Sequence, residues 1–250
     1  MFEDIKGKKV LVTGASSGIG ACTAELFARH GAVVGIHYHT GEGSARRLRG
    51  RLEGMAGEAI LLEADLLDPP SREELVPRFI GEAGGIDVLV NNAGGILGPA
   101  HFLDLDQSSW EMTLHLNLTA PYIMAREAFR WMKEHGGGRI INISSIAARY
   151  GGSETSIHYG AAKAGLEAVT RTMARAGATH NILVNTIQPG VIDTPAHKKI
   201  GRTSLVGRVK SIPLGRAGTP LDVARLCLFL ASEGGNRQSL ATSKIGRAHV

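Results

Sequence analysis

KVLVTGASSGIG, residues 9–20, is the stretch of sequence that decides the fold class. It begins with a short apolar run typical of a buried strand, continues into a glycine-rich turn, and leads into helical apolar periodicity at 21–30. A strand, a glycine-rich turn and a helix in this order form the phosphate-binding unit of dinucleotide folds. Gly14 permits the tight turn, Gly18 lets the backbone approach a pyrophosphate, and Gly20 allows close packing of helix on strand.

Further apolar runs alternate with helical patterns along the rest of the chain. They cover 32–38, 58–66, 86–94, 138–145 and 181–190. Near-continuous apolar strands separated by helices indicate a parallel sheet covered on both faces, and right-handed crossovers make it doubly wound. We predict a single-domain α/β (Rossmann) fold whose strands direct their carboxyl ends to one crevice. A long helix is predicted over 104–134, and Ser71 with Glu74 is predicted to cap the helix that Pro69 opens.

Tyr159 and Lys163 stand four residues apart in YGAAK, which places both side chains on one helix face. A phenol with a pKa of about 10 is a poor proton donor at neutral pH, and a neighbouring ammonium lowers that pKa. The pair can therefore act as a general acid and base. Taken alone, the same spacing also occurs on solvated helix faces.

The chain resembles the short-chain dehydrogenase/reductase family from about Lys6 to Gly235. The motifs that carry the resemblance are TGASSGIG (13–20), NNAG (91–94), Asn117 in LNLTAPY, Ser145 in INISS, YGAAK (159–163) and Pro189-Gly190 with Thr194. The resemblance implies the strand order 3-2-1-4-5-6-7. It also implies hydride transfer between a nicotinamide cofactor and a small carbonyl or alcohol substrate. In general appearance the chain is most similar to the 3-oxoacyl-thioester reductases of the family.

The resemblance implies a catalytic set of four residues, Asn117, Ser145, Tyr159 and Lys163. Tyr159 would exchange a proton with the substrate oxygen, and Lys163 would lower the Tyr159 pKa and bind the nicotinamide ribose. Ser145 would donate a hydrogen bond to the developing oxyanion. Asn117 would hold a water that connects Lys163 to solvent, or it would satisfy backbone groups inside its own helix. Ser144 is a rival for the catalytic hydroxyl.

The resemblance also implies a set of cofactor-binding residues. They are Gly14, Ser16, Ser17, Gly18, Ile19, Gly20, Tyr38, His39, Asp65, Leu66, Asn91, Ala93, Gly94, Tyr159, Lys163, Pro189, Gly190, Ile192 and Thr194. The second strand ends at 36–40 without a carboxylate, which permits the ribose phosphate of NADP, so NADP is favoured over NAD. Ser17 favours NAD instead, because many NADP-using relatives carry a basic residue at this position. Arg46 and Arg47 are either phosphate ligands or a solvated helix face, and Asp65 either meets the adenine or caps its loop.

Residues 193–211 follow the Pro-Gly motif and carry six basic side chains against a single acid, Asp193. The basic residues are His197, Lys198, Lys199, Arg202, Arg208 and Lys210. One interpretation is a mobile lid that attracts an anionic substrate such as an acyl thioester, and the other is a solvated pair of helices. Two alternative functions stay open: epimerisation or dehydration with a retained nicotinamide, and a catalytically silent dinucleotide-binding regulator.

Composition restricts the partners and the compartment. The net charge of +5 falls to +2 without the three basic residues of the last fifteen, and no basic stripe with interleaved aromatics occurs, so we expect no nucleic-acid partner. No apolar run is long enough to span a bilayer, no metal site is indicated, and two cysteines do not suggest a disulfide framework. We therefore expect a cytoplasmic protein. Trp110 and Tyr122 of the long helix are expected in the core or in the interface of a homodimer or homotetramer.

Residues 236–250 depart from the family, in which a seventh strand and a glycine pair end the chain. This stretch has no strand-like apolar run, and its last residues, KIGRAHV (244–250), are also what a common short-read sequencing adapter encodes in one reading frame. We expect an oxidoreductase domain over 1–235 followed by an artefactual tail over 236–250. The last strand is then missing or replaced, and the sixth strand is left as an exposed edge.

Overall fold

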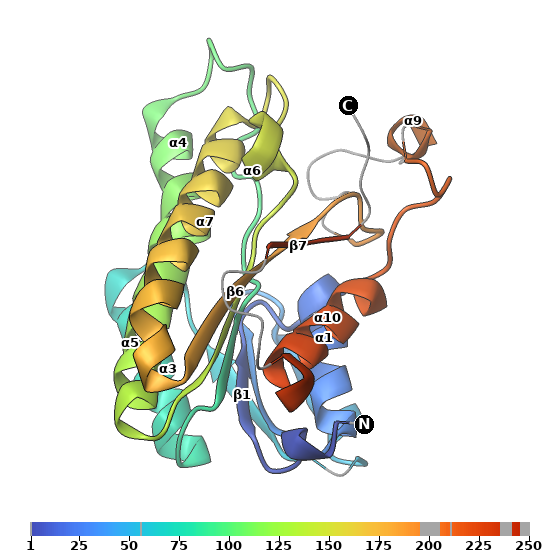
Figure 1. The fold of residues 1–250 in the computed structure, drawn as a ribbon. Coiled ribbons are helices and arrows are strands. Elements are labelled where there is room, and N and C mark those ends of the chain that lie inside the picture. The colour runs from blue at the N-terminus through green and yellow to red at the C-terminus, as the bar shows by residue number, and fades with distance from the viewer. Residues whose placement is uncertain (1, 56, 196–205, 211, 236–241, 246–250) are drawn as a thin grey trace.

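The computed structural model describes residues 2–55, 57–195, 206–210, 212–235 and 242–245. A parallel sheet of seven strands lies between two layers of helices (Figure 1). The strands are β1 Lys9–Val12, β2 Val33–Tyr38, β3 Ala59–Glu63, β4 Val88–Asn91, β5 Gly138–Ile143, β6 Ile182–Pro189 and β7 Thr242–Ile245. Their order in the sheet is β3-β2-β1-β4-β5-β6-β7, which confirms the predicted topology and the doubly wound α/β fold.

The helices cover the two faces of the sheet (Figure 1). One layer contains α1 (Gly18–Arg29), α2 (Glu42–Leu52) and α10 (Pro220–Ala231), and the other contains α3 (Pro69–Ala83), α4 (Gln107–Leu114), α5 (Ala120–Glu134) and α7 (Ile157–Gly177). The short helices α6 (Ala147–Tyr150) and α9 (Val206–Val209) lie in connections. Side chains alternate along each strand, so Val10 and Val12 join one apolar core and Leu11 joins the other. No helix in the described ranges is long and apolar enough to cross a membrane.

The predicted long helix begins at Gln107 rather than at 104 and is interrupted by a π-helical turn, His115–Thr119. The Asp106 side chain caps its start by accepting hydrogen bonds from Ser109 N and Ser109 Oγ, both at 2.8 Å. The π turn carries Asn117, and such turns frequently mark functional positions. Trp110 and Tyr122 are 36% and 42% exposed, so these aromatics lie outside the core, and their role in an interface stays a prediction.

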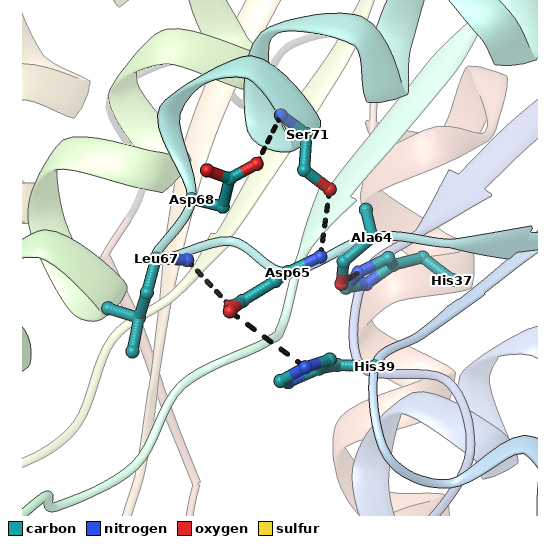
Figure 2. Close-up of polar contacts among 7 residues, drawn as sticks. All are labelled: His37, His39, Ala64, Asp65, Leu67, Asp68 and Ser71. Atoms are coloured by element: carbon teal, nitrogen blue, oxygen red, sulfur yellow. Dashed lines mark hydrogen bonds and ion pairs between the residues drawn. The ribbon is translucent and has the colours of Figure 1, made fainter.

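The start of α3 differs from the predicted capping box. Asp68, not Ser71, is the cap: its carboxylate accepts a hydrogen bond from Ser71 N at 3.0 Å (Figure 2). The reason is that Pro69 occupies the first helical position, where a missing N–H costs nothing, so the residue before it becomes the cap. The Ser71 hydroxyl instead accepts from Asp65 N at 2.9 Å.

The edge of the sheet also differs from expectation. β7 pairs in parallel with β6 over four positions, from Thr186 opposite Thr242 to Pro189 opposite Ile245. The expectation of an exposed β6 edge is therefore wrong, and the last strand is replaced rather than missing. A ladder is made by backbone N–H and C=O groups, so it can form without an apolar side-chain pattern. The rest of the tail, 236–241 and 246–250, lies outside the described residues. The expectation of an artefactual tail therefore stays a prediction for these residues.

Candidate active site

Tyr159 and Lys163 lie one turn apart on α7, as their spacing predicts. Lys163 is 3% exposed, and its Nζ donates a hydrogen bond of 2.8 Å to the carbonyl oxygen of Ile143, the last residue of β5. The same nitrogen lies 5.7 Å from the centre of the partly buried Tyr159 ring. α7 therefore presents the pair at the carboxyl end of the central strands.

The protonation of the pair is governed by burial. Burial lowers the pKa of Lys163 to about 8. Burial raises the pKa of Tyr159, and a hydrogen bond to Ser145 lowers it in part. The net shift of the Tyr159 pKa is therefore upward, opposite to the expected direction, because loss of hydration on burial dominates the phenol. Tyr159 is held as a neutral phenol, which is the proton-donating form.

The two adjacent serines have separate partners. The Ser145 hydroxyl hydrogen-bonds Tyr159 and accepts from Ala147 N at 3.1 Å. The Ser144 hydroxyl is buried and donates to Glu167 Oε1 at 2.8 Å. Ser144 is thus engaged away from Tyr159, and Ser145 is the serine in position to contact a reacting oxygen.

Asn117 is fully buried and holds the loop that follows β4. Its Nδ2 donates to Gly95 O at 2.8 Å and to Thr113 O at 2.9 Å, and its Oδ1 accepts from Gly95 N at 3.0 Å. The bond to Thr113 O satisfies a backbone group inside the helix, as one of the two interpretations expects, whereas the water that the other interpretation places on Asn117 stays a prediction. A Cβ added to Gly94 would lie 2.5 Å from Asn117 Oδ1 and 3.3 Å from Lys163 Nζ. Gly94 is therefore required for this close approach.

The glycine-rich loop is joined to the NNAG loop by side-chain contacts. Thr13 Oγ1 accepts hydrogen bonds from Asn92 N and Ala93 N, both at 2.9 Å, and Asn92 Nδ2 donates to Thr13 O at 2.8 Å. Gly14 has a φ of 62°, in the left-handed region that favours glycine. α1 begins after Ser17 with no side-chain cap, so its first N–H groups are available to a phosphate. This part of the chain fits a dinucleotide.

Two predicted cofactor ligands have side chains engaged elsewhere. Tyr38 is 6% exposed within an apolar core, and its hydroxyl hydrogen-bonds Glu63. Asn91 Nδ2 donates to Pro121 O at 3.0 Å and to Asn142 Oδ1 at 2.9 Å. Strand alternation is the physical reason, because successive side chains point to opposite faces of the sheet. The side chains of Tyr38 and Asn91 are thus engaged within the protein, and the prediction that these two residues bind the cofactor stays a prediction.

The acid and the histidine expected at the adenosine end lie together. His39 Nε2 is 3.8 Å from Asp65 Oδ2, and Asp65 Oδ1 accepts from Leu67 N at 2.9 Å (Figure 2). Asp65 therefore caps its own loop, one of its two predicted roles. The candidate phosphate ligands on α2 are exposed and have partners: Arg46 pairs with Glu42 at 2.7 Å, and Arg47 donates to Ser44 at 2.9 Å.

The remaining predicted residues lie after β3 and after β6. Leu66 is buried in an apolar core, and Ile192 is buried and bridges to Gly218. Thr194 approaches the glycine-rich loop, since a Cβ on Gly18 would lie 3.6 Å from it. Of the six basic residues in 193–211, Lys210 is exposed, and the other five side chains lie outside the described part of the chain.

Sequence reasoning missed two polar groupings. His37 bonds the glycine-rich loop, and Glu167, four residues after Lys163 on α7, accepts from both Ser144 and Gln188. The sequence did contain a signal for both groupings: His37 and Gln188 are polar residues inside apolar runs that were predicted to be buried strands, and a buried polar side chain needs a hydrogen-bond partner. A cavity of about 300 Å³ lined by Lys8, Asp87 and Arg139 lies at the amino ends of the strands and holds none of the predicted site residues.

Comparisons with known proteins agree with this geometry. A family model described as enoyl-(acyl carrier protein) reductase matches residues 14–240. A 3-oxoacyl-(acyl-carrier-protein) reductase from Chlamydia pneumoniae is 39% identical over 227 residues, which are 91% of this chain and 90% of that protein. The chain belongs to the short-chain dehydrogenase/reductase family.

Two further members of this family show its range. An L-rhamnose 1-dehydrogenase (NAD(P)(+)) from a Sphingomonas species is 38% identical over 237 residues, covering 92% of this chain and 91% of that protein. A short-chain dehydrogenase from Burkholderia cenocepacia, solved in complex with NADP, has a TM-score of 0.88 at 30% identity, covering 97% of each chain. Membership makes this short-chain dehydrogenase/reductase an NAD(P)-dependent oxidoreductase.

Proposed function

We propose that this short-chain dehydrogenase/reductase reduces the carbonyl of a small molecule, or oxidises the corresponding alcohol, with Tyr159 as general acid and base. The observation that carries the proposal is the convergence of Tyr159, Ser145 and Lys163 at the carboxyl end of β5. The nicotinamide, when bound, supplies or accepts the hydride. The residues then have to position the two reactants and move one proton.

Tyr159 donates its hydroxyl proton to the carbonyl oxygen while the carbonyl carbon becomes bonded to hydrogen. The raised Tyr159 pKa keeps the phenol protonated at neutral pH, which suits reduction. Ser145, already bonded to Tyr159, donates a hydrogen bond to the oxygen where negative charge develops. Lys163, next to the Tyr159 ring, stabilises the phenolate that remains and returns to it a proton drawn from solvent.

The alternatives have less support. A silent regulator does not need a serine bonded to the Tyr159 hydroxyl and a lysine beside its ring, whereas proton transfer from Tyr159 uses both. Epimerisation or dehydration would use the same residues and is separated from reduction by its products. For the substrate we propose a small carbonyl compound or alcohol, with an acyl thioester as one candidate because the Chlamydia pneumoniae relative is named for 3-oxoacyl reduction.

We propose NADP as the preferred cofactor, because the segment after β2 presents His39 rather than a carboxylate. We also propose a homodimer or homotetramer that covers the exposed Trp110, Met112 and Tyr122 of α4 and α5. A cytoplasmic location is proposed from the two free cysteines, Cys22 and Cys227.

The test is a dehydrogenase assay of the purified full chain against a panel of 3-oxoacyl thioesters, sugars, small ketones and alcohols, with both nicotinamide cofactors in both directions. Turnover in wild type that is lost in Tyr159→Phe is expected. Dinucleotide binding without turnover on any substrate class would favour the regulator. Product formed without net change of the nicotinamide would favour epimerisation or dehydration.

A further inference from the structure

His37 is a buried histidine whose two ring nitrogens bind two different loops. It lies near the end of β2 and is 2% exposed. Its Nδ1 accepts a hydrogen bond of 2.9 Å from Gly14 N. Its Nε2 is 3.1 Å from the carbonyl oxygen of Ala64, and Figure 2 draws the ring beside this residue. These partners are 23 and 27 residues away along the chain.

The chemistry of the partners determines the state of the ring. A backbone N–H can only donate, so Nδ1 has to be bare, and a carbonyl can only accept, so Nε2 has to carry the proton. The contacts are therefore compatible with one tautomer of the neutral imidazole. Burial agrees with this assignment, because it lowers the pKa of His37 to about 4.

Gly14 is the residue at which the glycine-rich loop leaves β1. Its N–H points into β2 rather than toward a phosphate, and it is bonded to the His37 ring. The next N–H, that of Ala15, donates to His37 O at 2.8 Å. One residue thus accepts two consecutive N–H groups of the loop, and this leaves the loop to present its later N–H groups and the start of α1.

The second bond of the His37 ring, to Ala64 O, reaches the segment around Asp65 where the adenosine of the cofactor is predicted to bind. Ala64 precedes Asp65, and Asp65 Oδ2 lies 3.8 Å from Nε2 of His39, which follows β2. The ring therefore links the end of β3 to the loop after β1, across β2. Both segments contain predicted cofactor-binding residues, but His37 itself is buried beneath them.

We propose that His37 is a positioning residue for dinucleotide binding: it holds the glycine-rich loop in its binding shape through Gly14, and it fixes that loop relative to the Ala64–Asp65 segment. The inference rests on the proposed use of a dinucleotide. A loop that is already shaped binds more tightly, because the cofactor does not have to order it.

Two substitutions separate the two bonds. The side-chain oxygen of His37→Asn is as many bonds from Cα as Nδ1, so it can accept from Gly14. The amide nitrogen of His37→Gln is as many bonds from Cα as Nε2, so it can donate to Ala64 while Gly14 loses its acceptor. Both variants lack the imidazole ring, so both lose its packing contacts and differ mainly in which hydrogen bond they keep.

The experiment measures the Kd of NADP⁺ and of NAD⁺ by calorimetry on the full chain, together with the thermal midpoint Tm. We expect His37→Asn to stay within about threefold of wild type and His37→Gln to bind about tenfold more weakly or worse, the effect of losing one buried acceptor. The Tm should fall by a similar amount in both. In a turnover assay, kcat of His37→Gln at saturating cofactor should be little changed while the cofactor KM rises.

Amide hydrogen exchange and ¹⁵N NMR of the wild-type ring give a second readout. Gly14 N–H should be protected in wild type and His37→Asn and unprotected in His37→Gln, and Nδ1 should be bare at neutral pH. Equal Kd values in the two variants would overturn the inference, as would a proton on Nδ1, which can be observed even if neither variant folds. Failure of the wild type to bind either dinucleotide would instead overturn the proposed function.

Discussion

The ε-amino group of Lys163 donates a 2.8 Å hydrogen bond to the carbonyl oxygen of Ile143, at the end of β5. This bond places a buried ammonium beside the Tyr159 ring and close to Gly94 of the NNAG loop. One lysine therefore contacts a strand end and lies beside the Tyr159 phenol and the loop at which the nicotinamide ribose is proposed to bind. Removal of its side chain should affect proton transfer and cofactor binding together.

Lys163→Ala is expected to reduce kcat by about 10²-fold or more and to weaken the Kd of NADP⁺. The reason is that the ammonium stabilises the phenolate and is also proposed to hold the cofactor. Steady-state kinetics and calorimetry measure the two effects separately. Lys133→Ala, on the exposed end of α5, is the matched control and should change neither value. An unchanged cofactor Kd in Lys163→Ala would contradict the second role.

Tyr159→Phe should lower kcat by about 10²–10⁴-fold, the usual contribution of general acid–base catalysis, while the cofactor Kd stays nearly unchanged. The substitution removes the proton donor and keeps the ring against Lys163. Tyr122→Phe removes an exposed phenol on α5 and serves as the control. If Tyr159→Phe keeps most of its activity, the proton must come from another group.

The neighbouring serines provide an internal comparison. Ser145→Ala should lower kcat by about 10²-fold or more, because the hydrogen bond to the developing oxyanion is lost. Ser144→Ala should leave kcat within a few-fold but destabilise the fold by about 1 kcal/mol, because Glu167 loses one donor. Kinetics and chemical denaturation of both variants test this division of roles. Equal losses of kcat in the two variants would contradict it.

Local signals in the sequence were sufficient for the core of the site. The spacing of Tyr159 and Lys163 and the glycines of the first turn act within one helix turn or one loop, so their geometry follows from nearby residues alone. These two features were predicted correctly because neither depends on which distant segment packs against them. The strand order does depend on distant pairings, and it was implied by the family resemblance.

The features that were missed depend on contacts between distant segments. His37 is defined by partners more than twenty residues away, and β7 by a backbone ladder that leaves no side-chain pattern. The family resemblance placed Tyr38 in the cofactor-binding set, and the structure adds that strand alternation directs its side chain into the core. The Tyr159 pKa was judged from one neighbour, whereas burial by the whole surroundings determines its direction.

The burial of Tyr38 makes its neighbour the site at which cofactor preference should be altered. His39→Asp would place a carboxylate directly after β2, at an exposed position whose present side chain lies 3.8 Å from Asp65. Repulsion should weaken NADPH and shift the ratio of kcat/KM for NADPH over NADH toward NADH by about tenfold or more. His39→Asn is the control, since it removes the imidazole without adding charge. A wild type that already strongly prefers NADH would show that the segment 36–40 was misinterpreted.

Acid should destabilise the fold through His37. Burial lowers its pKa from 6.5 to about 4, the bond to Ala64 opposes this shift, and His39 adds to it. Because the folded pKa lies below the unfolded one, the unfolded chain binds the proton first as the pH falls. Stability is therefore complete above about pH 6.5 and decreases as the pH falls toward 4, by up to about 3 kcal/mol from this residue.

Denaturant unfolding at intervals from pH 7 to pH 4 measures this loss. Ionisable side chains on the segments around His37 are His39, which follows β2, Glu63 and Asp65 at the end of β3, and Arg72 on α3. Their contribution is retained in His37→Asn, which cannot take up a proton at position 37. The difference between wild type and His37→Asn should therefore change with pH by about 2–3 kcal/mol, with wild type losing more in acid. Parallel pH profiles for the two proteins would show that the buried ring does not titrate in this range.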